Sequence, residues 1–278
     1  MSLIEIKNLS FSYDKSHKTL NNINLKINEG EFIGILGRSG SGKSTLIQLI
    51  DGLLKPDNGT IFFDGIDIFK NPKKFQDFRF KIGLVLQNPE DQLFCETVFD
   101  DIAFGLRNMH LDKIEIENRV LKSIEIVDLN KNILIKSPFE ISGGEKRRVA
   151  IAGVIAMMPD VLILDEPTAG LDPIGRQNLL SLIKKYHVLN NKTVILISHD
   201  VNDIVSLADK VAIMKNWKIK AFGSISQIFT DYKRLKKLGI EPPEITQIIL
   251  KLNSLGFNFR NDIFTVEDAL SEIFRDFK

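Results

Sequence analysis

The sequence lacks several features that would tie a protein to a particular environment. With one cysteine, Cys95, among 278 residues, no disulfide can form within the chain, and a reducing compartment is expected. No run of about 18 uncharged apolar residues occurs, which excludes a hydrophobic membrane-spanning helix. Residues 1–5 lack the basic-then-apolar layout of a signal peptide. The 37 basic and 36 acidic side chains nearly cancel, so no global field attracts nucleic acid. We therefore expect a cytosolic chain, unless a partner holds it at a membrane.

A glycine-rich segment at residues 37–44 is the strongest positive feature. It matches G-x-x-x-x-G-K-[ST], in which backbone N–H groups and the lysine face phosphates and the final hydroxyl binds Mg²⁺. A flexible linker is the alternative, but a strand-like run precedes the segment and a helix-like run follows it. We predict nucleotide binding by Gly37, Arg38, Ser39, Gly40, Ser41, Gly42, Lys43, Ser44 and Thr45.

The pattern along the chain predicts an α/β fold. The first third reads as strands and turns, and residues 91–135 have helical spacing with many charges. After residue 142, helical segments alternate with strand-like runs at 161–164 and 193–197, which indicates βαβ units and a parallel sheet. From about residue 224, short helices broken by glycines and prolines suggest a separate small element.

Two further segments carry groups suited to phosphate chemistry. Asp165 and Glu166 directly follow the apolar run at 161–164. They could simply begin a solvated loop. Beside a phosphate loop, however, Asp165 suits Mg²⁺ binding and Glu166 suits activation of the attacking water. Ser142 opens a second glycine-rich entry into a helix. Ser142 with Glu145 reads as a capping box, and the same helix start suits an anion; the two interpretations are compatible.

The order of these motifs resembles the ATPase subunit of an ATP-binding cassette (ABC) transporter. The motifs are residues 37–44, Gln87, residues 142–145, residues 165–166, residues 171–172 and His199. The resemblance implies a P-loop NTPase fold with a mixed-sheet core, an antiparallel β subdomain and a helical subdomain at about 91–158. It places the ATPase domain at residues 1–224 and a C-terminal helical dimerisation extension at residues 225–278. It also implies that two cassettes close head-to-tail around two ATP molecules.

The resemblance assigns a role to individual residues. The catalytic residues would be Glu166, His199 and Gln87, and the Mg²⁺ ligands Ser44, Gln87 and Asp165. The partner's ATP would be bound by the signature residues Ser142, Gly143, Gly144 and Glu145, with Asp172 in the dimer loop. Tyr13 would stack on adenine, with Phe11 as a rival. The chain departs from the commonest signature at Ile141 and Glu145, and the charge of Glu145 is expected to slow turnover.

Residues 88–94, the segment around Arg147 and the C-terminal extension resemble the energy-coupling factor (ECF) group. This implies an ATP-hydrolysing subunit of an importer for vitamins or transition-metal ions, peripheral at the cytoplasmic face of the membrane. The implied partners are a second ABC ATPase, a paralogue rather than a copy of this chain, a transmembrane scaffold and substrate-binding membrane subunits, but no nucleic acid. The alternatives are a cassette of another ABC importer and a soluble ABC ATPase acting on nucleic acid or ribosomes.

Apolar side chains beside Gln87 have two interpretations. Leu93, Phe94, Val98 and Phe99 suit either a groove for a helix of a membrane subunit or the core of a helix.

Overall fold

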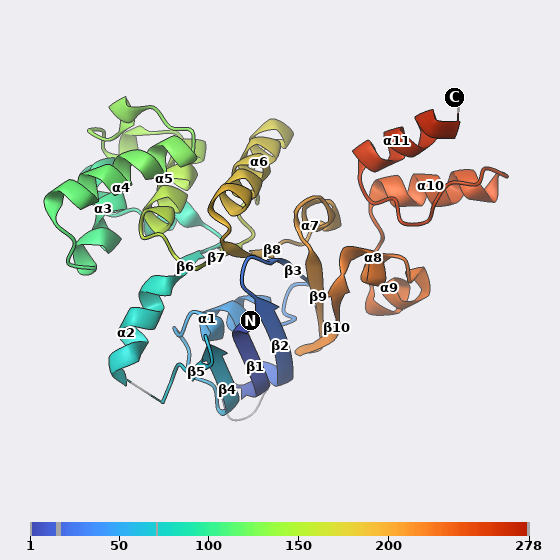
Figure 1. Cartoon of the computed structure of the whole chain (residues 1–278), viewed down its shortest axis with the longest axis horizontal. Coiled ribbons are helices and arrows are strands. Elements are labelled where there is room, and N and C mark those ends of the chain that lie inside the picture. The colour runs from blue at the N-terminus through green and yellow to red at the C-terminus, as the bar shows by residue number, and fades with distance from the viewer. Residues whose placement is uncertain (1, 15–17, 71, 277–278) are drawn as a thin grey trace.

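The computed structural model describes residues 2–14, 18–70 and 72–276, and contains two sheets with helices around them (Figure 1). The larger sheet has the strand order β10-β9-β3-β8-β7-β6. Its strands are β3 (Phe32–Leu36), β6 (Ile82–Val85), β7 (Val161–Asp165), β8 (Thr193–Ile197), β9 (Lys210–Lys215) and β10 (Lys218–Ser224). All neighbours are parallel except β9 and β10, which are antiparallel. The predicted parallel sheet is confirmed, and the hairpin β9–β10 extends one edge.

Alternate residues of the central strands face two different apolar cores. On β3, Phe32 packs in one core with Leu162 and Leu196, whereas Ile33 packs in the other with Ile163. Strands buried on both faces need apolar side chains at every position, not at every second one. This requirement explains the uninterrupted apolar runs in the sequence.

The smaller sheet is antiparallel and lies below the larger one in Figure 1. Its order is β2-β1-β4-β5, made of β1 (Ser2–Phe11), β2 (Leu20–Asn28), β4 (Asn58–Phe63) and β5 (Ile66–Asp67). Helix α1 (Lys43–Ile50) packs in the same core as this sheet, and α2 (Pro72–Lys81) leads into β6. The strands expected in the first third of the chain are therefore present.

Helices α3 (Val98–Asn108), α4 (Lys113–Ile126) and α5 (Gly143–Ala156) pack together. A short 3₁₀ segment at Pro89–Gln92 precedes α3, and two more, at Lys131–Ile133 and Pro138–Glu140, lie between α4 and α5. Helices α6 (Pro173–Asn190) and α7 (Val201–Leu207) follow β7 and β8, which completes the predicted alternation of strand and helix.

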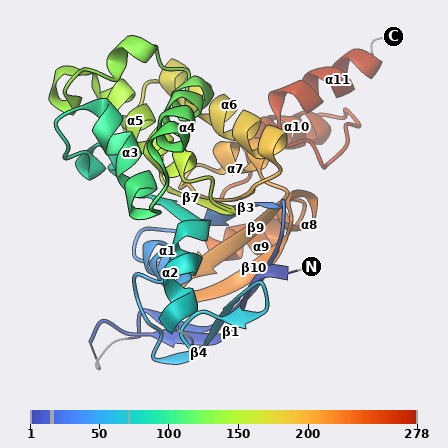
Figure 2. The same ribbon diagram turned by 60° about the vertical axis from the view of Figure 1, so that its left-hand side comes forward.

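The C-terminal segment contains α8 (Ile225–Phe229), α9 (Tyr232–Leu238), α10 (Glu244–Ser254) and α11 (Val266–Asp276). Phe229 and Leu235 belong to the main core, whereas α10 and α11 share a small core around Ile249 and Ile263. Figure 2 shows α10 and α11 on the opposite side of the molecule from α3 and α4. The division of the chain after residue 224 stays a prediction. Within the described residues, no helix has the length and apolar character needed to cross a bilayer.

Candidate active site

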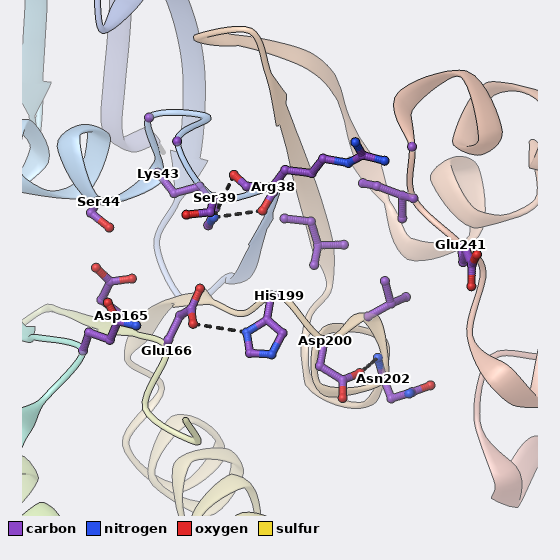
Figure 3. A pocket seen from close by; sticks show the side chains of 18 of the residues that line it. Arg38, Ser39, Lys43, Ser44, Asp165, Glu166, His199, Asp200, Asn202 and Glu241 are labelled. Carbon is purple, nitrogen blue, oxygen red and sulfur yellow. Dashed lines mark hydrogen bonds and ion pairs between the residues drawn. The ribbon is translucent and has the colours of Figure 1, made fainter. Parts of the chain in front are cut away.

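A pocket of about 810 Å³ lies where the parallel strands end, as Figure 3 shows. The segments after β3, β6, β7 and β8 all reach it, because the carboxyl ends of parallel strands meet at one edge of the sheet. The predicted site residues that line it are Gly37, Arg38, Ser39, Gly40, Gly42, Lys43, Ser44, Thr45, Gln87, Asp165, Glu166 and His199. Residues from four widely separated motifs thus share one cavity.

The phosphate loop has the curled backbone that anion binding requires. Gly40 and Gly42 have φ values of +75° and +98°, which residues with a Cβ rarely adopt. Helix α1 begins after Gly42 without a side-chain cap, so the N-terminal N–H groups of this helix are available to a ligand. The buried Lys43 ammonium donates to the carbonyl of Gly37 at 2.8 Å and to that of Arg38 at 3.3 Å. The loop therefore holds its cation inside the pocket.

Asp165 and Ser44 lie together at the floor of this pocket. The pKa of Asp165 is raised, mainly by burial, although the hydrogen bond that it accepts from the Ser44 hydroxyl opposes this rise. Carboxylate and hydroxyl oxygens are the ligands that Mg²⁺ prefers, with phosphates and water completing its shell. Among residues 2–14, 18–70 and 72–276, no cluster of three or more acidic, His or Cys side chains could hold a metal alone. The pair therefore fits a metal that arrives with a phosphate ligand.

Glu166 and His199 form a contact across the ends of β7 and β8. Nδ1 of His199 donates to Oε2 of Glu166 at 3.1 Å (Figure 3). Glu166 has φ +48°, an uncommon conformation for a residue with a long side chain, and such strain gathers at functional sites. Its N–H donates to the Ile197 carbonyl at 3.0 Å, which ties the two strand ends together.

Tyr13 lies outside the residues that line the pocket but beside them. Its hydroxyl donates to Gln48 Oε1 at 3.2 Å and lies 3.3 Å from Thr45 Oγ1. Its ring is 63% exposed, whereas the ring of Phe11 is buried against it. Of the two aromatic candidates for stacking on a base, Tyr13 is the accessible one.

A sequence model of the ABC transporter family matches residues 20–169, just over half of the chain. This chain belongs to the ABC transporter family. A relative from Clostridium acetobutylicum, "Energy-coupling factor transporter ATP-binding protein EcfA2", is 49% identical, and the match covers 98% of this chain and 97% of the relative. This ABC chain is therefore an ATPase of the ECF group, and the pocket lined by its motifs is the candidate site for ATP, called the ATP pocket below.

Two solved structures have the same fold as this ABC cassette. One is cbiO1 from Clostridium perfringens, described as part of the ABC transporter complex cbiONQ, with a TM-score of 0.77 and 36% identity over 89% of this chain and 98% of that one. The other is the ATP-binding cassette MJ0796, a dimer in a post-hydrolysis state bound to ADP and Pi, with a TM-score of 0.72 and 29% identity over 80% of this chain and 98% of that one.

The signature residues of the cassette lie away from its own ATP pocket. Ser142 caps α5 in the expected capping box: Glu145 N–H donates to Ser142 Oγ at 3.3 Å, and Ser142 N–H donates to Glu145 Oε2 at 2.9 Å. The Ser142 hydroxyl also donates to Glu145 at 2.7 Å. Hydrogen bonds from the Ser142 hydroxyl and N–H lower the pKa of Glu145. Gly143 and Gly144 follow in the first turn of α5. None of these four residues, nor Asp172, lines the ATP pocket, and their predicted roles toward a partner stay predictions.

Ser41 of the phosphate loop also differs from its predicted place. It is buried and is absent from the residues lining the ATP pocket, and its hydroxyl has no hydrogen-bond partner among the described residues.

The segment that joins α9 to α10 forms a wall of the ATP pocket. Its lining residues are Gly239, Ile240, Glu241, Pro242, Pro243 and Glu244, with Gln247 on α10. Arg38 points toward this segment in Figure 3, and Glu241 lies at the far side. The sequence shows only the helix breakers here. Nothing in the motif order indicates that the C-terminal segment reaches the ATP site.

Arg147, one helical turn after the signature, connects two loops of the cassette. Its buried guanidinium donates to the Ala169 carbonyl at 2.7 Å and lies 3.6 Å from the Glu90 carboxylate. Ala169 follows Glu166, and Glu90 follows Gln87, so one side chain contacts both segments that extend from the pocket. Both partners are distant in sequence, which leaves no local signal for this contact.

The apolar residues beside Gln87 divide between core and surface. Val98 is fully buried, and Leu93 and Phe99 pack partly against the core. Phe94 is 62% exposed and meets the exposed Phe104 edge-on at 4.9 Å. Cys95 lies beside them, and burial with the nearby Asp101 carboxylate raises its pKa to about 11, so it is an unreactive thiol.

Proposed function

We propose that this chain hydrolyses ATP as one half of a two-cassette motor that powers an ECF-type importer. The observation that carries the proposal is the convergence of Lys43, Asp165 and the Glu166–His199 pair on one pocket. Phosphoryl transfer needs positioning and charge stabilisation more than covalent chemistry, and these side chains supply both.

The predicted site residues that line the pocket have distinct roles in this reaction. The phosphate-loop N–H groups and Lys43 bind the β- and γ-phosphates, and Ser44, Asp165 and Gln87 are suited to hold Mg²⁺. When bound, Mg²⁺ neutralises charge on the phosphate oxygens. The Glu166 carboxylate accepts a hydrogen bond from the water that attacks phosphorus in line with the departing ADP oxygen. His199, oriented by Glu166, would contact the γ-phosphate.

The second half of the site comes from another cassette. Ser142, Gly143, Gly144 and Glu145 would bind the partner's ATP, and Asp172 would cross the interface. Two observations support this arrangement: these residues do not line the chain's own pocket, and the N–H groups of Gly143 and Gly144 at the start of α5 are not used by the capping box and suit a phosphate. The dimeric MJ0796 structure with ADP and Pi offers a similar cassette in such a pair. A paralogue of this chain is the proposed partner.

The proposed membrane partners are a transmembrane scaffold and small substrate-binding subunits that import vitamins or transition-metal ions. The exposed Phe94 and Phe104 beside the Gln87 segment would receive a helix of the scaffold. The proposed location of the chain is the cytoplasmic face of the membrane. The alternative of a soluble ABC ATPase is disfavoured, because coupling to nucleic acid or ribosomes gives no role to this apolar pair.

Purification of the full chain from its native membranes in mild detergent tests the assembly. A second cassette and multi-spanning subunits should copurify, and the complex should hydrolyse MgATP. In the same complex, Glu166→Gln should remove at least the share of hydrolysis that this chain's site contributes and should trap ATP. Recovery with ribosomes or DNA in the soluble fraction would overturn the transport proposal. Wild-type turnover by Glu166→Gln would overturn the catalytic assignment.

A further inference from the structure

We propose that Arg176 is a positioning residue for ATP hydrolysis, which fixes the turn that carries His199 against Glu166. The inference rests on the proposed function of the pocket. Arg176 lies on α6 and does not line the pocket, so it acts through other residues.

Arg176 binds two acidic residues, Asp200 and Asp203, in the segment 198–203 that carries His199, which we call the histidine turn. Its Nε and Nη2 donate to Asp203 Oδ1 at 2.9 and 2.6 Å, and Nη2 also donates to Asp200. Asp203 is 3% exposed, and a buried carboxylate is costly unless a cation or several donors meet it. Burial alone would raise the pKa of Asp200, but the hydrogen bond from Arg176 lowers that pKa below its usual value. The guanidinium therefore neutralises two carboxylates that would otherwise repel each other.

The turn itself is closed by short internal hydrogen bonds. Ser198 Oγ donates to Asp203 Oδ2 at 3.1 Å and accepts from Asp200 N–H at 3.0 Å. Asp200 Oδ1 accepts from Asn202 N–H at 2.8 Å and so caps α7. His199 lies at the tip, with a side chain that is 71% exposed. Because little packing restrains the ring, the shape of the turn sets its position.

The loop after Glu166 is attached to the same carboxylate. Thr168 Oγ1 donates to Asp203 Oδ2 at 3.1 Å, so both partners of the Glu166–His199 contact connect to Asp203. The left-handed backbone of Glu166 needs such support to persist. Removing Arg176 would leave Asp203 buried without its cation and would loosen both loops together.

Arg176 also lies one turn after the predicted dimer loop. Asp172 caps α6 by accepting from Gly175 N–H, and its carbonyl accepts from Arg176 N–H at 2.9 Å. The partner-facing loop and the histidine turn therefore meet at the first turn of one helix. A displacement of Asp172 caused by the partner cassette would therefore be transmitted through Arg176 to the position of His199.

The test compares variants of the full chain in the purified membrane complex, with MgATP as the probe. Glu166→Gln first defines the share of hydrolysis that this chain's site contributes. For the hydrolysis that this chain's site contributes, Arg176→Met should lower kcat on the order of 10- to 100-fold. The KM for ATP should change by no more than about twofold, because the catalytic side chains are still present but misplaced. Arg176→Lys should restore part of kcat, since one ammonium can bind either carboxylate but not both in a fork.

Lys184→Met is the matched control, because Lys184 also lies on α6 and donates to a carbonyl of α7, that of Ser206, at 3.5 Å. It should leave kcat unchanged. Asp200→Asn keeps the cap of α7 and removes the charge that Arg176 binds, which provides a second variant if Arg176→Met fails to fold. It should lower kcat as Arg176→Met does, and the double variant should lose little more than either single one.

The outcomes separate this inference from the proposed function. If the wild-type complex and Glu166→Gln hydrolyse ATP equally, the catalytic assignment of Glu166 fails, and the inference that rests on it fails as well. If Glu166→Gln is inactive but folded Arg176→Met or Asp200→Asn turns over like wild type, the inference alone is overturned. Equal loss of kcat in Arg176→Met and Lys184→Met, tracking lost folded protein, would also overturn it.

Discussion

The guanidinium of Arg38, in the phosphate loop, lies against Gly239, in the segment that joins α9 to α10. A Cβ added at Gly239 would lie 3.0 Å from Arg38 Nη2 and 3.4 Å from Cζ, so the guanidinium would have to shift by a few tenths of an ångström. The Arg38 carbonyl in turn accepts a hydrogen bond from Lys43. The C-terminal segment therefore reaches the ATP pocket through a residue of the phosphate loop.

Gly239→Ala should weaken ATP binding as well as stability. Gly239 has φ +76°, where a Cβ costs on the order of 1 kcal/mol, and the displaced Arg38 should raise the KM for ATP about fivefold, equivalent to about 1 kcal/mol. Gly256→Ala is the control, because Gly256 also has a positive φ but no atom within 4 Å of an added Cβ. Both variants should lower Tm, and an equal KM in both would contradict the contact.

Lys43→Ala should abolish tight ATP binding. The variant removes the ammonium group proposed to bind the β- and γ-phosphates, so Kd should rise on the order of 100-fold, or about 2.7 kcal/mol. Titration calorimetry with ATP measures this directly. Lys81→Ala, a change of a half-exposed lysine on α2, should leave Kd unchanged. Equal affinity in wild type and Lys43→Ala would refute the role of Lys43.

Glu145→Gln should raise turnover of the complex about two- to tenfold. Glutamine still completes the capping box with Ser142, but it removes a negative charge from the segment proposed to face the partner's ATP. The difference should shrink as salt is added, because salt screens exposed charges. Glu140→Gln changes a second capping box, with Ser137, that lies outside the signature, and it should have no such effect. A rise in both variants would point to a structural cause.

Asp51→Asn should stabilise the protein at pH 8. Burial raises the pKa of Asp51 from 3.8 to about 7, so between these values the folded state binds a proton that the unfolded state releases. Wild-type stability attributable to Asp51 therefore falls as the pH rises from about 4 to 7, by on the order of 2–4 kcal/mol at 1.36 kcal/mol per pH unit. Urea unfolding of both proteins at several pH values measures the difference. It should vanish below pH 4, and the exposed control Asp57→Asn should show none.

The sequence alone determines those parts of the site that form from neighbouring residues. The curl of residues 37–44, the capping box of Ser142 with Glu145 and the start of α6 at Asp172 depend on groups within one turn. Backbone conformation and caps are set by such short-range contacts, so a motif is enough to predict them. The uninterrupted apolar strands likewise indicate a sheet covered on both faces.

Tertiary structure decides the contacts between residues that are far apart in the chain. Arg176 contacts Asp200 and Asp203, which are 24 and 27 residues away in the sequence. Arg38, near the N-terminal end of the sequence, lies against Gly239 in the C-terminal segment. These pairs form only because strands and helices pack so that their ends converge, and a charged side chain alone does not reveal its distant partner. The side chain of Arg176 would look like any solvated helix residue in the sequence, whereas the fold places it between two carboxylates beneath His199.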